Sequence, residues 1–236
     1  MYDFTGRIRF SETDASGRLS LAGLLDYFQD CATLHSHDAE LSVAELRRRR
    51  TVWVLSAWQV IITRMPEMGE RVRCVTNPYD VKGFLGFRNF VLETEEAERL
   101  SIANSVWTVI DPETGKPARI GEDVPGKYGL GPALEMSYAP RKIKVEGDPM
   151  PDPSPAPVTV FGHMLDTNGH MNNAHYVTLA EDCLPGPISC RQLRVEYKSP
   201  ARGGDLIFPK IYAVGEKRIV VLSDGGGKPY AVVEFS

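Results

Sequence analysis

The sequence predicts an α+β protein in which a long helix, packed against a strongly curved antiparallel sheet, is built twice in tandem. Three observations predict this fold. The chain repeats itself, each copy has a single helix near its start, and several runs rich in β-branched and aromatic residues follow each helix. A chain of 236 residues is long enough to bury a hydrophobic core in each of two modules.

The internal repeat has an offset of 152 residues, at which residues 11–31 (SETDASGRLSLAGLLDYFQDC) align with residues 163–183 (HMLDTNGHMNNAHYVTLAEDC). Five aligned pairs are identical: Asp14 with Asp166, Gly17 with Gly169, Ala22 with Ala174, Asp30 with Asp182, and Cys31 with Cys183. Further along, residues 64–72 resemble residues 199–207, because each stretch places a proline shortly before a glycine and an acid. This order of features in both copies is typical of a duplicated module.

The first copy begins with a short strand at residues 4–10, and a helix over residues 21–37 follows, with Ser20 as a suitable N-cap. Apolar residues recur in this helix at helical spacing, at Leu21, Leu24, Leu25, Phe28 and Ala32. Four later runs have the composition of strands: residues 51–64, 71–81, 86–95 and 101–111.

The second copy has the same order of elements. A strand at residues 158–164 precedes a helix that Asn172 or Asn173 caps and that runs to about Cys183, where Pro-Gly-Pro at 185–187 ends it. Four runs again resemble strands: residues 190–199, 206–214, 218–224 and 229–235.

Between the copies, residues 147–158 (GDPMPDPSPAPV) alternate proline with other residues, a pattern that favours a stiff polyproline II strap. We therefore predict an N-terminal module at residues 1–125, a Pro-rich linker at 126–157 and a C-terminal module at 158–236.

Composition excludes several classes of protein. The net charge of −4 argues against nucleic-acid binding, and no apolar run approaches the ~20 residues that a membrane-spanning helix needs. The first residues lack the apolar segment of a secretory signal. Four cysteines are scattered without the spacing of a metal site, which is typical of a reducing compartment. We expect a cytoplasmic protein that binds no metal and no cofactor.

The most informative stretch is LDTNGHMNNAHY at residues 165–176, where Asp166, Asn168 and His170 alternate. In an extended segment this spacing puts all three on one face, and the helix that follows offers unpaired backbone N–H groups. A carboxylate, an amide, an imidazole and backbone donors in one small volume suit the attack of water on an activated carbonyl. The first copy has Ser16 and Arg18 in place of the amide and the imidazole, so we expect chemistry in the second copy alone.

These segments resemble the bacterial acyl-ACP thioesterases, which are relatives of the plant fatty-acyl-ACP thioesterases. The resemblance covers nearly the whole chain and is most specific at residues 165–182. It implies a double hotdog fold, in which the first module encloses the acyl chain and the second carries the catalytic residues. It also implies hydrolysis of the thioester that joins a fatty acyl chain to acyl carrier protein, with release of the fatty acid and termination of chain elongation.

By this resemblance, Asp166, Asn168 and His170 are the catalytic residues. Backbone N–H groups between Gly169 and Asn173 are expected to form the oxyanion site. We therefore predict that three residues contact the substrate: Gly169, Asn172 and Asn173. Capping of the helix explains the two asparagines nearly as well.

The sequence departs from the plant relatives at one place. They carry a Glu followed by a Cys, linked to catalysis, where this chain has Pro200 and Ala201. Glu196 lies four residues upstream, about 13 Å along a strand, which is too far for a direct replacement. Either Asp166 is the only carboxylate base, or another acid reaches the site, or the activity is low.

Several alternatives stay open at this stage. The run ELRRRR at residues 45–50 is either a solvated helix end or a docking surface for acidic acyl carrier protein. The protein is alternatively an acyl-CoA thioesterase, or an acyl-binding module without activity. The sequence determines neither the preferred acyl chain length nor the choice between a monomer and a homodimer.

Overall fold

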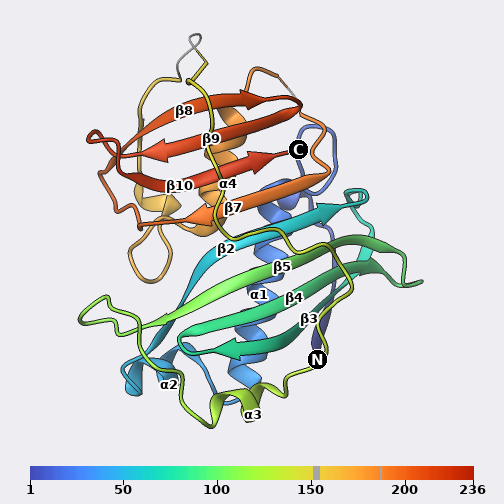
Figure 1. Ribbon diagram of the computed structural model, residues 1–236. Coiled ribbons are helices and arrows are strands. Elements are labelled where there is room, and N and C mark those ends of the chain that lie inside the picture. Colours follow the sequence, from blue (N-terminus) through green and yellow to red (C-terminus); the bar gives the residue numbers. More distant parts are fainter. Residues whose placement is uncertain (151–154, 187) are drawn as a thin grey trace. The chain divides into compact units, whose positions relative to one another are not determined.

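The computed structural model describes residues 1–150, 155–186 and 188–236, which form two compact units (Figure 1). Unit 1 comprises Met1–Ser56 and Val60–Ala139, and unit 2 comprises Ala57–Gln59 and Pro140–Ser236. The border between residues 139 and 140 falls inside the predicted linker. Residues 151–154, in the middle of the predicted polyproline strap, lie outside the described residues, as does residue 187 of the predicted helix stop.

Unit 1 consists of a sheet with one long helix and two short ones. Its elements are β1 (Tyr2–Arg7), a 3₁₀ turn (Phe10–Glu12), α1 (Leu21–Asp38), α2 (Val43–Arg48), β2 (Val52–Ile62, of which Ala57–Gln59 belong to unit 2), β3 (Arg71–Lys82), β4 (Leu85–Thr94), β5 (Arg99–Ile110) and α3 (Val124–Tyr128). The strands are ordered β1-β3-β4-β5-β2, and the first three pairings are antiparallel. All five strands predicted in this part of the sequence are confirmed, each within a few residues.

Helix α1 begins and packs as its sequence predicts. The Ser20 hydroxyl accepts a hydrogen bond of 3.0 Å from the N–H of Gly23, which satisfies one donor of the first turn. On its buried face, Phe28 contacts Phe90 of β4, with ring centroids 5.2 Å apart, and both rings are fully buried. Burial of each such side chain contributes about 1.5–3 kcal/mol, so this face fixes the helix on the sheet.

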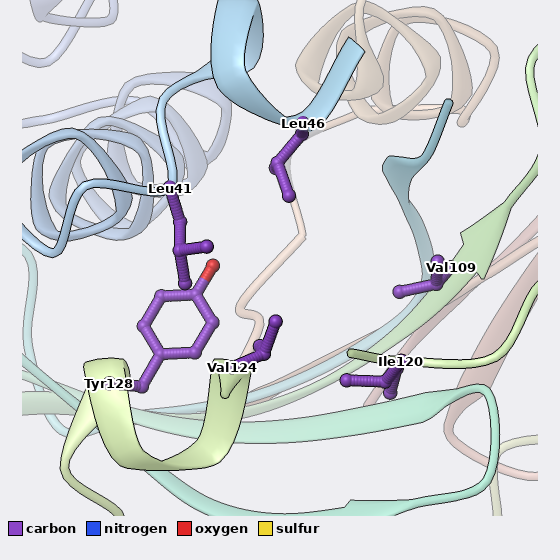
Figure 2. Packing of buried hydrophobic residues seen from close by; sticks show 6 residues of the cluster. All are labelled: Leu41, Leu46, Val109, Ile120, Val124 and Tyr128. Atoms are coloured by element: carbon purple, nitrogen blue, oxygen red, sulfur yellow. The ribbon is translucent and has the colours of Figure 1, made fainter. Parts of the chain in front are cut away.

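A second apolar cluster of unit 1 contains a helix that the sequence analysis missed. Figure 2 shows its six buried members: Leu41, Leu46, Val109, Ile120, Val124 and Tyr128. The last two lie on α3, which ends at Gly129 in the left-handed conformation. Five residues are too few for apolar periodicity to predict a helix, so α3 depends on this cluster for its stability.

Unit 2 has the same kind of sheet and one main helix. Its elements are β6 (Val158–Thr159), a 3₁₀ turn (Gly162–Met164), α4 (Asn173–Asp182), β7 (Gln192–Tyr197), β8 (Leu206–Val214), β9 (Lys217–Ser223) and β10 (Pro229–Phe235). The strand order β7-β10-β9-β8-β6 is antiparallel throughout. The four strands predicted after the helix are confirmed. No helix in the described ranges is both long and apolar enough to cross a membrane.

The strand predicted at residues 158–164 is wrong over its second half. Only Val158 and Thr159 pair with β8. The chain then closes a tight turn, because Met164 N–H donates to the carbonyl of Phe161 at 3.0 Å. Gly162 within this turn has no side chain to pack on a sheet, which weakens the strand signal there.

The segment that follows residue 140 covers one face of the unit 2 sheet. Ile143 is buried in a cluster with Ile219 and Val232. Arg194 of β7 donates to the carbonyl of Pro140 at 2.6 Å, which fastens the beginning of the segment to the sheet.

Candidate active site

The residues predicted to be catalytic form a closed turn instead of an extended segment. Asp166 N–H donates to the carbonyl of His170 at 2.7 Å. In return, Asp166 Oδ1 accepts hydrogen bonds from the N–H groups of Asn168 (2.8 Å) and His170 (3.1 Å). Gly169 has a φ of 73°, which glycine adopts at little cost. The expected alternation on one extended face is therefore wrong, because an Asp and a Gly at these positions favour a turn.

The turn brings two of the three predicted catalytic side chains into contact. Asn168 Nδ2 donates to Asp166 Oδ2 at 3.3 Å. Asp166 is half-buried and Asn168 is exposed. His170 joins the turn through its backbone, and its side chain is half-buried. The carboxylate is thus oriented by three N–H donors and has an exposed amide beside it.

Helix α4 begins directly after the turn. Asn172 is its N-cap: the side-chain oxygen accepts a hydrogen bond of 2.9 Å from Ala174 N–H, and the Asn172 N–H donates to the carbonyl of Met164 at 2.8 Å. Asn173 is the first helical residue, and its carbonyl accepts a hydrogen bond of 2.9 Å from the Tyr197 hydroxyl. The capping alternative for Asn172 is confirmed, and the positive end of the α4 dipole lies next to the turn.

A segment that follows β7 closes the other side of the turn. His170 and Arg202 form an antiparallel bridge, and Met171 N–H donates to the carbonyl of Ala201 at 2.9 Å. Ala201 is fully buried, and its own N–H donates to the Tyr176 hydroxyl at 2.8 Å. The positions of the expected Glu and Cys therefore adjoin the turn, although neither carries an acid here.

Glu196 does not replace the missing acid. Its side chain is buried and accepts a hydrogen bond of 3.1 Å from Ile143 N–H through Oε2. Its Oε1 pairs with Lys198 at 2.9 Å. Glu196 thus holds the covering segment on the sheet, and Asp166 is the carboxylate that closes the turn.

Sequence reasoning missed Tyr176, which belongs to the apolar face of α4 and is 2% exposed. In the alignment of the two copies at an offset of 152 residues, Tyr176 pairs with Leu24, and this difference is the only sign of Tyr176 in the sequence. A hydroxyl-bearing side chain stands where the first copy has an aliphatic one.

Two histidines flank the start of α4. The ring of His163 stacks on Phe161, with centroids 6.0 Å apart, and meets the ring of His175 edge to face at 6.5 Å. Partial burial and the neighbouring His163 lower the pKa of His175. This lowering favours the neutral imidazole of His175, which can accept a hydrogen bond in the first turn of α4.

Unit 1 contains the same turn in the first copy of the repeat. Asp14 Oδ1 accepts hydrogen bonds from the N–H groups of Ser16 (2.8 Å) and Arg18 (3.2 Å), and Gly17 has a φ of 77°. Partial burial opposes ionisation, but the hydrogen bonds from Ser16 and Arg18 lower the pKa of Asp14 on balance. Each turn lies between a 3₁₀ turn and the N-cap of a helix, so the two units share this local structure in detail.

A third example shows what such an aspartate does by itself. In the β9–β10 hairpin, Asp224 Oδ1 accepts hydrogen bonds of 2.9 Å from the N–H groups of Gly226 and Lys228. Gly227 there has a φ of 82°. This aspartate only closes a hairpin. Any chemistry at Asp166 must therefore come from what surrounds it.

The arginine run after Val43 is largely neutralised by neighbouring acids. Three of its arginines form ion pairs: Arg48 with Glu45, Arg49 with Glu45 and Asp123, and Arg50 with Glu113. Hydrogen bonds from Arg48 and Arg49 lower the pKa of Glu45 to about 2. The pairing favours a structural role for the run at the end of α2.

Comparison with known proteins shows a match to one protein family and similarity to several relatives. The sequence pattern described as the acyl-ACP thioesterase N-terminal domain matches residues 1–128. The chloroplastic palmitoyl-acyl carrier protein thioesterase of Arabidopsis thaliana is 26% identical over 222 residues, which cover 88% of this chain and 53% of that protein. The chain spans about half the length of the curated relatives it matches.

Two solved structures share the fold. A crystal structure of an acyl-ACP thioesterase from Bacteroides thetaiotaomicron has a TM-score of 0.88 at 24% identity, covering 99% of this chain and 96% of that one. The 12:0-ACP thioesterase from Umbellularia californica has a TM-score of 0.83 at 18% identity, covering 100% and 96%. The shared fold is α+β, with antiparallel strands and few helices.

Proposed function

The chain belongs to the acyl-ACP thioesterase family, and from this we propose that it hydrolyses the thioester between a fatty acyl group and acyl carrier protein. The products are a free fatty acid and the free thiol of the carrier, so the reaction ends chain elongation. The observation that carries the proposal is the difference between the two turns. Their backbone hydrogen bonds match, but only unit 2 places an amide and an imidazole at the two variable positions, Asn168 and His170.

In this proposal each unit is one hotdog module. A helix of 18 residues in unit 1, a helix of 10 residues in unit 2, and the antiparallel strands of each unit support it. Unit 1 receives the acyl chain and unit 2 carries the catalytic residues. The four cysteines are free thiols, which supports a location in the reducing cytoplasm.

The reaction follows from the groups around the turn. A water molecule gives a proton to Asp166 Oδ2 while its oxygen attacks the thioester carbonyl carbon. The carbonyl oxygen becomes an oxyanion, which the positive amino end of α4 stabilises. The backbone N–H groups of Gly169, His170, Met171 and Asn172, expected from the sequence to form the oxyanion site, are instead hydrogen-bonded within the turn and to neighbouring segments. The carbon–sulfur bond then breaks, and the proton that Asp166 took from water reaches the departing thiolate through His170, so that both side chains return to their starting state. Asn168 holds the carboxylate in place throughout.

We propose that the carrier contacts a basic surface of unit 2 instead of the arginine run. Arg141, Lys142 and Lys144 are exposed, and none of them forms an ion pair with any described residue. Lys142 and Lys144 line a groove of about 480 Å³, together with Glu146, the Glu196-paired Lys198 and apolar residues that include Ile143. In a chain with net charge −4, this cationic patch complements an acidic protein.

Charge reversal tests the carrier surface. We expect the double variant Lys142→Glu/Lys144→Glu to raise KM for acyl-ACP roughly tenfold with little change in kcat, because two exposed charges contribute up to ~1 kcal/mol each. The matched control, Arg99→Glu/Lys116→Glu, changes the net charge equally at two exposed residues of unit 1 and should keep the wild-type KM. Steady-state kinetics at several salt concentrations decide it, and equal KM values for the two variants would contradict this surface.

Release of free thiol from purified protein tests the function. We expect turnover on at least one acyl-ACP in a series from short to long acyl chains, and slower turnover on the matching acyl-CoA. Equal or faster rates on acyl-CoA would favour an acyl-CoA thioesterase. Acyl chains that bind without release of thiol from either carrier would instead identify a non-catalytic acyl-binding protein.

A further inference from the structure

Beside the turn, the two units share one backbone hydrogen bond and differ in the hydrogen bond next to it. In unit 1, Leu19 N–H donates to the carbonyl of Pro66 at 2.9 Å. In unit 2, Met171 N–H donates to the carbonyl of Ala201 at the same distance. The next residues also correspond. The N–H of Glu67 donates to the Glu70 side chain, and the N–H of Arg202 donates to the Asp205 side chain, three positions later in both units. Pro66 and Ala201 are therefore equivalent positions.

Unit 1 has no polar group to satisfy at this position. Pro66 has no N–H, and Leu24, which corresponds to Tyr176 at the 152-residue offset, is aliphatic and buried. In unit 2 the Ala201 N–H and the Tyr176 hydroxyl are both buried and bond to each other at 2.8 Å. A buried donor and acceptor are costly unless paired, so this pair is a specific feature of the unit with the proposed chemistry.

The pair lies one residue from the turn. Ala201 accepts the hydrogen bond of Met171, and the adjacent Arg202 bridges His170. The Tyr176 ring also meets the Tyr197 ring edge to face, with centroids 5.7 Å apart. Tyr197 in turn holds the carbonyl of Asn173. The two tyrosines thus connect both sides of the turn to the interior of unit 2.

We propose that Tyr176 is a positioning residue for thioester hydrolysis. Its hydroxyl fixes Ala201, Ala201 fixes Met171, and the bridge to Arg202 then sets the place of His170 relative to the Asp166 carboxylate. The Tyr176 hydroxyl acts through Ala201, to which it is hydrogen-bonded, and not as a catalytic group. This inference rests on the proposed function, since it concerns the geometry of the same site.

Removal of the hydroxyl tests this role. We expect Tyr176→Phe to lower kcat for acyl-ACP by about 10- to 100-fold with little change in KM, because a shift of about 1 Å at a reacting group costs up to that much. Tyr27→Phe is the matched control. Tyr27 lies on the buried face of α1, and its hydroxyl donates to Glu12 Oε2 at 3.1 Å, far along the chain from the turn. This control should lose a similar hydroxyl and keep the wild-type kcat.

A second measurement separates positioning from general stability. Amide hydrogen exchange should become faster at Met171 in Tyr176→Phe, whereas exchange at Leu19, its counterpart in unit 1, should stay unchanged. The double variant Tyr176→Leu/Ala201→Pro reproduces the apolar pair of unit 1. It should be as thermally stable as the wild type and still have a low kcat.

The outcomes distinguish this inference from the function on which it rests. A wild-type kcat in Tyr176→Phe, or a restored kcat in the double variant, would overturn the positioning role and leave the thioesterase proposal intact. A wild-type protein that releases no thiol from any acyl-ACP would overturn both.

Discussion

Asp166→Asn should lower kcat for acyl-ACP hydrolysis by about 10²- to 10⁴-fold, the range that general base catalysis contributes. An asparagine keeps the oxygen that accepts the N–H groups of Asn168 and His170, so the turn should survive. What disappears is the charge that draws a proton from water. The expected result is a folded protein with nearly unchanged KM and very low turnover.

The repeat supplies the control for this variant. Asp14→Asn makes the same chemical change in a turn with the same backbone hydrogen bonds. We expect it to keep the wild-type kcat, because Ser16 and Arg18 replace the amide and imidazole there. Stopped assays of free thiol, together with thermal unfolding of each variant, make the comparison. Equal losses of activity in both variants would show that these aspartates act only through folding.

Much of the fold could be predicted from local sequence. Ser20 is a predictable N-cap, and the sequence narrows the second cap to Asn172 or Asn173, because these short polar side chains precede the helical segments. The strands were recognised from runs of β-branched and aromatic residues. Capping and strand composition each depend on a few neighbouring residues, so a single sequence is enough to identify them.

The conformation of the site was harder to predict, because spacing alone does not distinguish a strand from a turn. Alternation of Asp166, Asn168 and His170 suggested an extended face, while Gly169 at positive φ turned the chain instead. The identical pair of Gly17 and Gly169 in the repeat was the signal that favoured a turn.

Contacts between distant segments were also inaccessible to local reasoning. Arg49 pairs with Asp123, which lies 74 positions away, and Ala201 bonds Tyr176, which lies 25 positions away. No pattern of neighbouring residues indicates such partners. The charge of the arginine run and the polar role of Tyr176 both depended on them.

The pH dependence of folding should reveal a buried histidine in unit 1. His35, on the last turn of α1, is 7% exposed, and its Nδ1 lies 2.9 Å from the guanidinium of Arg88. Burial and the Arg88 charge lower the pKa of His35 to about 4 from its ordinary 6.5, although the nearby Asp38 opposes this. Burial also lowers the pKa of Arg88, to about 10, so Arg88 stays charged at neutral pH. His35 is therefore held neutral in the folded protein.

The sign of the effect follows from the two pKa values of His35. Between pH 6.5 and 4 the unfolded chain binds a proton at this histidine that the folded protein does not. Acidification through this range therefore favours unfolding, and the free energy of unfolding should fall by about 3 kcal/mol. Above pH 6.5 the histidine is neutral in both states and stability should no longer depend on it.

Two variants isolate this histidine from the other acid-sensitive groups. In His35→Gln, the free energy of unfolding should decrease much less between pH 6.5 and 4 than it does in the wild type. His175, whose pKa is also lowered, is present in both proteins and therefore does not affect the comparison. Arg88→Met removes the neighbouring charge, so the pKa of His35 should rise towards its ordinary value and the decrease should shrink. Denaturant unfolding at a series of pH values measures the free energies, and the His35 ring signals in NMR measure its pKa directly. Identical pH profiles for the wild type and His35→Gln would show that His35 is not the group responsible. His35 and Arg88 both contact the ring of Tyr128 inside the unit proposed to receive the acyl chain. The unfolding free energies of the two variants therefore also measure how a buried charge in this unit affects its stability.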